Sequence, residues 1–258
     1  MHEFSPNFNA TLEAQHLRLY GNDIVPLIRP DGTVADSFSV NQIHWTGRFS
    51  WEERVNRGFF DKVYIFTRFP VITVDLVAGL KGITPEDCSF YRGELTMDWR
   101  VPAGAVGFGR LHLNGGAILG SVPYPLLKLH EGNQTYFMDR SAFSCMNYYE
   151  FASDRWVTGF YEHNLNGFLL GKIPLVRRLD LREVFTVRAA WGTISDQNRQ
   201  NAPYRLLDGM GSLDRPYVEA GVGIANIFRI LRIDGFWRLT HLENNRNFVI
   251  NVSLDLDF

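Results

Sequence analysis

The sequence lacks any apolar run of the length that a membrane-spanning helix needs, which is about 20 residues. The longest candidate, at residues 69–80, contains Pro70 and Asp75 and is better suited to a strand. The start of the chain has no basic segment followed by an apolar one, so no secretory signal is visible. These absences argue against a protein that crosses a membrane with helices.

The sequence also has few cysteines and a net charge close to zero. Only Cys88 and Cys145 are present, and we expect two unpaired thiols, with one disulfide as the alternative in an oxidising compartment. Neither cysteine has a nearby ligand partner and the seven histidines are scattered, so we expect no zinc site and no cofactor. A net charge of −2 provides no basic field, which argues against nucleic acid as a partner.

What the chain does contain is alternation, most clearly in its last twelve residues, NFVINVSLDLDF. Every second residue counted back from the end is apolar, which predicts a strand with one apolar and one polar face. Such a strand suits either a soluble sheet packed on a core or a transmembrane barrel whose apolar face contacts lipid. The alternating apolar residues are Phe248, Ile250, Val252, Leu254, Leu256 and Phe258.

The other alternating stretches favour the barrel. In residues 90–100, large apolar side chains on one face oppose charged and polar ones on the other. Opposite charges two residues apart, as in Arg92/Glu94 and Arg232/Asp234, suit a lumen in which neighbouring strands neutralise each other. The aromatic fraction of 14% fits the aromatic girdles of a barrel. A soluble sandwich with a salt-bridged outer face is the alternative.

We therefore predict an all-β fold, an antiparallel transmembrane β-barrel with about 10–12 strands. Residues 1–258 form one domain, which we expect to be the C-terminal part of a larger barrel. A further strand at residues 62–68 is weakly indicated, and residues 174–179 suggest a short helix or an irregular turn. The predicted strands are residues 11–20, 38–52, 71–80, 90–100, 108–117, 143–152, 156–165, 181–191, 217–228, 231–241 and 248–258.

The terminal aromatic residue also has an explanation in a barrel. Outer-membrane barrels typically close with a last strand that ends in Phe or Trp and is recognised by the assembly machinery. We predict that the alternating residues from Phe248 to Phe258 form such a C-terminal assembly signal. The expected partners are outer-membrane lipid and, during insertion, the barrel assembly machinery.

Three segments, at residues 121–156, 161–183 and 215–241, resemble a known family. They are similar, in order and spacing, to the C-terminal barrel of a family from the outer membranes of Bacteroidetes. Its members carry a carboxypeptidase-regulatory-like domain ahead of a domain of unknown function. The resemblance extends from residue 121 to the end and less distinctly upstream from about Pro70. It implies an outer-membrane location.

The family's barrel is distantly similar to the BamA-type superfamily. In that superfamily, a loop ahead of the last strands folds into the lumen and places an arginine against acidic residues on the wall. Residues 121–142 occupy the comparable place here, so the resemblance implies Arg140 as the arginine, with Asp139, Glu150 or Glu162 as its partner. A buried guanidinium needs a carboxylate to offset its desolvation.

The expected function is a non-enzymatic outer-membrane barrel protein, with a role in transport, surface display or envelope assembly. One alternative is an outer-membrane hydrolase with residues such as Ser141, Asp139 and His130 at the barrel rim, although their spacing does not compel a catalytic arrangement. Another is a soluble β-barrel or sandwich that binds a ligand.

Overall fold

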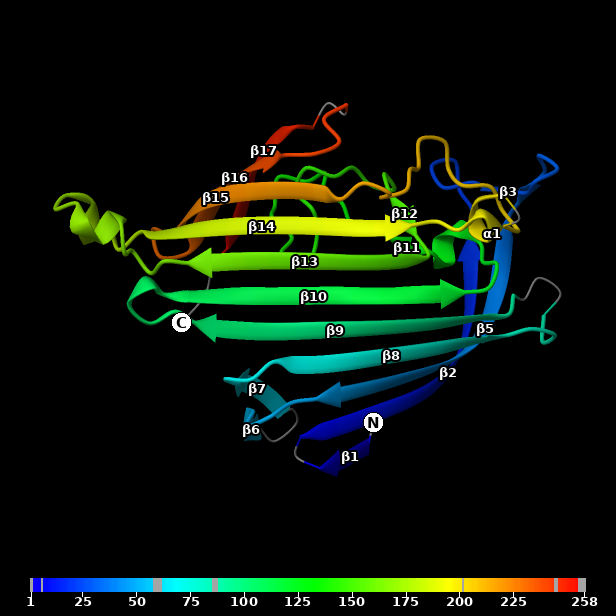
Figure 1. Ribbon diagram of the computed structural model, residues 1–258, viewed down its shortest axis with the longest axis horizontal. Helices are drawn as coiled ribbons and strands as arrows, with labels where there is room; N and C mark the ends of the chain where they lie inside the picture. The colour runs from blue at the N-terminus through cyan, green and yellow to red at the C-terminus, as the bar shows by residue number, and fades with distance from the viewer. Residues whose placement is uncertain are drawn as a thin grey trace.

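The computed structural model describes residues 2–5, 7–57, 62–84, 88–200, 202–243 and 246–254. In these ranges, eleven strands form one antiparallel sheet in which each strand pairs with the next sheet strand along the chain (Figure 1). The sheet strands, in order, are β1 His2–Ser5, β2 Phe8–Tyr20, β5 Ser37–Phe49, β8 Val71–Leu80, β9 Phe90–Pro102, β10 Phe108–Leu119, β13 Arg155–Asn164, β14 Arg182–Thr193, β15 Tyr217–Ile227, β16 Leu231–Arg238 and β17 Phe248–Leu254.

Short elements lie outside this sheet. Three two-stranded pairs accompany four 3-10 helices and one short α-helix, and no helix in the described ranges is long and apolar enough to span a membrane. The pairs are β3 Leu27–Ile28 with β4 Val34–Ala35, β6 Arg54–Arg57 with β7 Lys62–Phe66, and β11 Lys128–Leu129 with β12 Ala152–Ser153. The helices are η1 Gly104–Val106, η2 Tyr124–Leu126, η3 Leu170–Lys172, η4 Val176–Leu179 and α1 Asp196–Arg199.

The sheet curves around residues 120–154, the connection between β10 and β13, which we call the inner loop (Figure 1). We call the sheet face toward this loop the inner face and the opposite face the outer face. Along β15, Tyr217 and Glu219 are buried on the inner face, whereas Val222 and Ile224 on the outer face are 46% and 42% exposed. Since side chains alternate along a strand, one strand supplies both faces.

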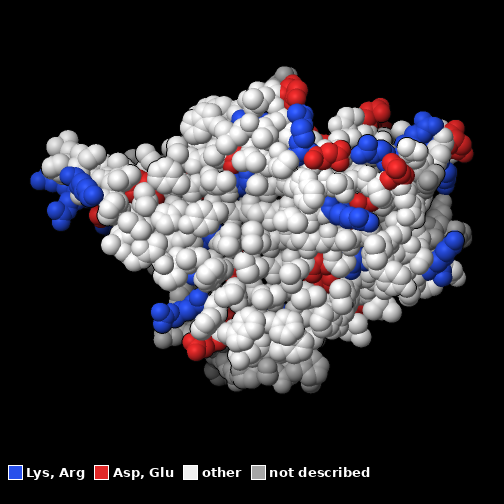
Figure 2. Space-filling model, viewed as in Figure 1, with Lys and Arg blue, Asp and Glu red and all other residues white. Residues whose placement is uncertain are grey.

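The polarity of the two faces is the reverse of that in a soluble sheet, which buries its apolar face. On β14 to β16, charged side chains lie buried inside, and large apolar side chains lie exposed outside. Figure 2 shows an outer face that is largely uncharged, with Lys, Arg, Asp and Glu concentrated toward the ends of the strands. The arrangement supports the polarity predicted for a barrel strand.

Two apolar clusters anchor the inner loop. One lies at the end of the sheet near β3 and includes Phe38, Tyr124, Trp156 and Tyr204. The other packs the middle of the loop onto β14 and β15 and contains Phe143, Met146, Phe151, Ala190, Leu213 and Tyr217. Each buried aromatic ring removes a large apolar area from water, so the clusters hold the loop against the sheet.

The strand predicted at residues 143–152 is wrong. This segment is an irregular part of the inner loop, and only Ala152–Ser153, as β12, is strand. The backbone N–H groups of Ser144 and Cys145 donate to the side chain of Glu219 instead of to a neighbouring strand. A buried carboxylate thus replaces the strand partner that the alternation suggested.

The structure agrees with the predicted fold class, the number of sheet strands and the two weakly indicated segments. The all-β, antiparallel class is confirmed, and eleven sheet strands lie within the predicted 10–12. The weak strand at residues 62–68 is β7, in a hairpin apart from the large sheet. Residues 174–179 contain the short 3-10 helix η4, and neither cysteine forms a disulfide.

The two ends of the strand order are β1 and β17, and these strands do not pair with each other within the described residues. The inner loop covers part of β17. The Val252 N–H donates to the Tyr136 carbonyl at 2.8 Å, and the Met138 N–H donates to the Val252 carbonyl at 2.9 Å. The loop therefore reaches from the first apolar cluster to the last sheet strand.

Candidate functional site

The inner face carries a row of charged side chains that the strand register places side by side. Arg188 of β14 lies opposite Glu219 of β15, and Glu219 lies opposite Arg238 of β16. All three are buried, with exposures of 2%, 0% and 4%. Since directly opposite residues on adjacent strands are close enough to interact, register alone assembles this arginine–glutamate–arginine row.

Glu219 binds the backbone of the inner loop. Its two carboxylate oxygens accept the N–H groups of Ser144 and Cys145 at 2.8 and 2.9 Å, and the Tyr217 hydroxyl donates to it at 2.9 Å. Burial and then the Glu219 carboxylate raise the pKa of the Cys145 thiol to about 12. Cys145 therefore stays a protonated, inert thiol in the folded protein.

The two arginines of the row bind loop carbonyls. Arg188 donates to the Ala142 carbonyl, and to Ser144 Oγ at 3.0 Å. Arg238 donates to the Cys145 carbonyl at 3.4 Å and forms an ion pair with Glu150 of the loop at 2.7 Å. The sheet thus supplies both the cations and the anion that hold the loop.

A second group of charged side chains on the inner face extends from β16 to β13 and β10. The Arg232 guanidinium contacts Asp234 through two hydrogen bonds of 2.7 and 2.8 Å and Glu162 through one of 2.7 Å. Arg110 lies 3.4 Å from the other oxygen of Glu162. Bidentate pairing and a shared carboxylate offset the cost of burying these charges.

The residues predicted to meet in one contact of the inner loop lie in different parts of the structure. Glu150 pairs with Arg238 and Glu162 pairs with Arg232, both of which belong to the sheet. Asp139 accepts a hydrogen bond from the Ser141 N–H at 2.8 Å, and Arg140 lines a cavity next to the loop. Arg188, Glu219 and Arg238 were not among the predicted residues. The signal for them was a charged residue at an inward position of each of the strands β14, β15 and β16.

The predicted assembly signal lies partly inside the described residues. Phe248, Ile250 and Leu254 of β17 are 49%, 55% and 63% exposed on the outer face, and Val252 is half-buried. Leu256 and Phe258 lie outside the described residues.

The three residues considered for a hydrolase do not lie together. Asp139 and Ser141 are neighbours in the exposed part of the inner loop. His130 is buried, and its Nε2 lies 2.9 Å from Ser153 Oγ, a different serine. Burial and then Lys128 lower the pKa of His130 to about 3, so the ring is neutral. The described part of the chain holds no group of three or more metal-ligating side chains.

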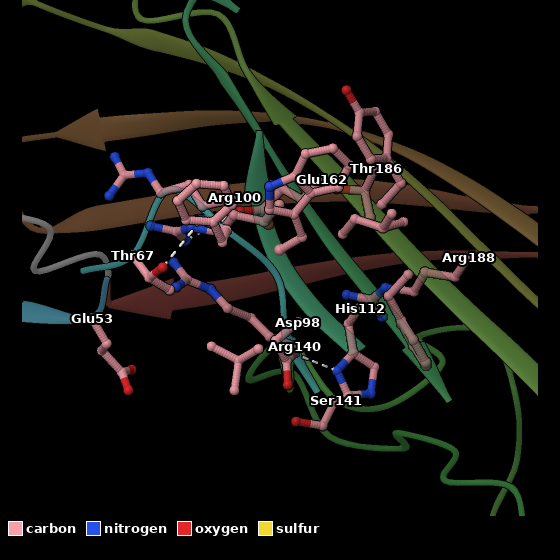
Figure 3. A pocket seen from close by; sticks show the side chains of 17 residues that line it. Glu53, Thr67, Asp98, Arg100, His112, Arg140, Ser141, Glu162, Thr186 and Arg188 are labelled. Atoms are coloured by element: carbon pink, nitrogen blue, oxygen red, sulfur yellow. Dashed lines mark hydrogen bonds and ion pairs between the residues drawn. The ribbon is translucent and has the colours of Figure 1, made fainter. Parts of the chain in front are cut away.

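A cavity of about 430 Å³ lies between the inner loop and strands β9, β10, β13 and β14 (Figure 3). Side chains from the sheet and from the loop both line it. Its charged and polar lining includes Arg100, Arg110, Arg140, Glu162, Thr186 and Arg188.

Comparisons with known proteins give two similarities. No curated protein matches the chain. Among solved structures, the chain is similar to BamA from Haemophilus ducreyi, in a crystal structure lacking POTRA domains 1-3, with 14% sequence identity and a TM-score of 0.48. That similarity covers 87% of this chain and 45% of the other, so the chain spans less than half the length of that structure.

The second similarity is to a protein family and covers residues 40–197. This stretch contains the segments at residues 121–156 and 161–183, and it starts further upstream than the sequence analysis expected. The segment at residues 215–241 lies beyond it. Because the match covers more than half of the chain, the protein belongs to the family of unknown function DUF5686, of which it contains the C-terminal domain.

Proposed function

We propose that this protein is a non-enzymatic β-sheet domain of a bacterial outer membrane, with lipid against its outer face and the inner loop inside. The observation that carries the proposal is the reversed polarity of the sheet. Several large apolar side chains on the outer face of β13 to β16 are more than 40% exposed: Val157, Val187, Trp191, Val222, Ile224, Ile233 and Trp237. In water these would form a large exposed apolar surface, whereas in a bilayer they would contact hydrocarbon.

The inner face supports a structural role for the buried charges. Arg188 and Glu219 form an ion pair, and these two residues and Arg238 all bond to the backbone of the inner loop. A loop held by so many bonds would fill the lumen. Transport, surface display and envelope assembly are the roles that we propose for such a filled domain.

The proposal also includes the membrane in which the domain lies and the proteins that accompany it. The family resemblance suggests a Bacteroidetes outer membrane and a carboxypeptidase-regulatory-like domain in the same protein. Insertion would then depend on the barrel assembly machinery. In lipid, every backbone N–H and C=O group needs a partner, so the proposal requires the edges of β1 and β17 to be paired in the membrane.

Heat modifiability tests the proposal. The purified chain is refolded into detergent micelles, and boiled and unboiled samples are compared on a denaturing gel. We expect the unboiled sample to migrate faster, because a sheet whose two edges are paired in the micelle, as the proposal requires, resists the gel detergent until it is heated. A single unshifted band, together with a soluble monomer in buffer without detergent, would contradict membrane insertion.

A further inference from the structure

We infer that the hairpin of η3 and η4, residues 165–181, lies on the surface of the membrane and binds lipid phosphates through its arginines. The inference rests on the proposed function, because it requires a sheet that already lies in a bilayer. The hairpin connects β13 to β14 and extends beyond the end of the sheet (Figure 1). If the sheet spans a bilayer, the hairpin begins at the level of the lipid head groups.

The hairpin exposes large apolar side chains together with the neighbouring turn between β15 and β16. Leu179 of the hairpin is 61% exposed, and Phe228 of the turn is 85% exposed. Asn226, at the end of β15, donates from its Nδ2 to the Asp180 carbonyl at 2.8 Å, so hairpin and turn form one surface. A contiguous apolar surface of this kind marks an interaction site. Its other exposed apolar side chains are Phe168, Leu169, Ile173, Leu175 and Ile230.

The turn between β15 and β16 carries residues that its backbone disfavours. Phe228 and Arg229 have φ angles of 50° and 70°, in the left-handed region. Asn, Asp and Gly normally occupy such positions in tight hairpin turns, because they adopt positive φ at little cost. A large ring and a long cation bring no benefit to this turn itself, and they indicate a contact outside the chain.

The same surface carries positive charge that the described chain does not neutralise. Figure 2 shows Lys and Arg gathered on the hairpin, at the left of the view. Asp180 is the only acidic residue in residues 165–182, and the next one, Glu183, is buried and accepts the N–H groups of Leu169 and Leu170. Four exposed cations of the surface form no ion pair with any residue that the structure describes: Lys172, Arg177, Arg178 and Arg229.

Phosphate is the anion that suits these arginines. A guanidinium group is a planar fork of donors that matches phosphate oxygens. Arg177 and Arg182 line a hollow of about 310 Å³ next to Asn226, with Asp180 also in its lining. Asparagine and arginine side chains both supply N–H donors, so the hollow can hold the oxygens of a head group.

The apolar side chains favour a membrane over an acidic protein as the source of that phosphate. They continue the exposed outer face of the sheet, whose members nearest to this end include Phe185 of β14 and Ile224 of β15. One lipid surface can therefore cover both. Basic residues beside apolar ones are typical of segments that lie in a membrane interface, where charged and apolar side chains are both tolerated.

A fluorescent label on the hairpin tests the inference. Ile173→Cys is labelled with a nitrobenzoxadiazole dye in a Cys88→Ser background, in which Cys145 is buried and stays unlabelled. The protein is reconstituted into vesicles of phosphatidylcholine alone or mixed with anionic phosphatidylglycerol. We expect a blue-shifted emission that is protected from aqueous iodide, with a larger protected fraction in the mixed vesicles.

Two other results would overturn the inference. A label that stays in water in both kinds of vesicle, in protein that still shows the heat-dependent gel shift, would assign the surface to a protein partner and leave the proposed function standing. Equal protection in both kinds of vesicle would show that the arginines do not select an anionic surface. Loss of the gel shift itself would contradict the proposed function and the inference together.

Two double variants locate the charge. Arg177→Gln with Arg178→Gln should lower the ratio of protected to free label in the mixed vesicles by about thirtyfold, since each arginine near an anionic surface contributes about a factor of five. The matched control is Arg199→Gln with Arg215→Gln, which removes two exposed arginines at the other end of the sheet, where they pair with Asp214 and Glu243. The control should behave like the wild type. An equal loss in both double variants would overturn the assigned surface.

Discussion

Glu219 is the residue through which the sheet holds the inner loop. Its carboxylate accepts the N–H groups of Ser144 and Cys145 on separate oxygens and lies opposite Arg188 and Arg238. An amide in its place would present an NH₂ group to one of these donors and would leave Arg188 without its counter-charge. Breaking a buried ion pair in this way costs about 3–5 kcal/mol.

We therefore expect Glu219→Gln to lower the free energy of unfolding by about that amount and to expose Cys145. In a Cys88→Ser background, maleimide should label Cys145 at least about tenfold faster in the variant, because the wild-type thiol is buried with a raised pKa. Glu243→Gln is the control, since Glu243 and its partner Arg215 are both 76% exposed. Equal labelling of Glu219→Gln and wild type would show that Glu219 does not hold the loop.

A second single residue, His130, makes the stability of the folded chain depend on pH. Its pKa is about 3 in the folded chain, against an ordinary value of 6.5, because burial disfavours the charged ring. The unfolded chain therefore binds more protons between pH 6.5 and 3, and stability falls as the pH falls through this window. Between pH 7 and pH 5, this one group accounts for about 2 kcal/mol.

The variant His130→Gln should remove that contribution, because glutamine does not titrate and can still bond to Ser153. Urea unfolding at pH 7 and pH 5 gives the drop in stability for each protein. The drop should be smaller in the variant by about 2 kcal/mol. Identical drops would mean that His130 is already charged or exposed in the folded chain.

At the scale of strands, the outer face can be tested by charge. Val222 lies in the middle of β15 and faces outward. In a bilayer, Val222→Lys should cost about 2–4 kcal/mol near the midplane, because the ammonium group would lie in hydrocarbon. Leu175→Lys is the matched control, since Leu175 is 86% exposed in the hairpin of η3 and η4, beyond the end of the sheet (Figure 1).

Both substitutions should be compared by urea unfolding in lipid vesicles. A loss of stability confined to Val222→Lys fits lipid contact. If the sheet stood in water, Val222 would already be half solvated and both variants would unfold like the wild type. Because both side chains are exposed in the structure, neither substitution disturbs a packed core, and the difference between the two variants reports whether Val222 lies in lipid or in water.

Local alternation could predict most of the strands, and it failed where a segment's partners are distant. The strands at residues 217–228 and 231–241 were predicted because inward and outward side chains alternate within each. In residues 143–152, the apolar side chains pack on the inner face and the backbone bonds to Glu219, which lies 74 residues after Cys145. Nothing within the segment itself indicates that carboxylate.

The same limit applied to the site. The pairs Arg92/Glu94 and Arg232/Asp234 could be predicted because residues two apart share a strand face, and both are present, at 2.6 and 2.7 Å. The Arg188–Glu219 pair depends on the register of β14 with β15, across the connection between them. Register follows from packing of the whole sheet, so sequence alone did not pair these residues.

For the whole molecule, the remaining question is which solvent surrounds the sheet, and two tryptophans at neighbouring positions can answer it. Trp156 of β13 and Trp191 of β14 lie one register position apart, yet on opposite faces. Trp156 is 2% exposed and donates to Asn114 on the inner face, whereas Trp191 is 51% exposed on the outer face. A quencher dissolved in lipid should therefore reach only one of them.

We expect brominated lipids to quench part of the tryptophan fluorescence of the reconstituted protein, and aqueous iodide to quench little of it. Trp191→Phe should lower the fraction quenched by brominated lipid, because it removes an outward ring. Trp156→Phe should raise that fraction, because it removes a protected one. If iodide quenches Trp191 instead, and the brominated lipid leaves both variants alike, then the outer face lies in water and lipid contact is excluded.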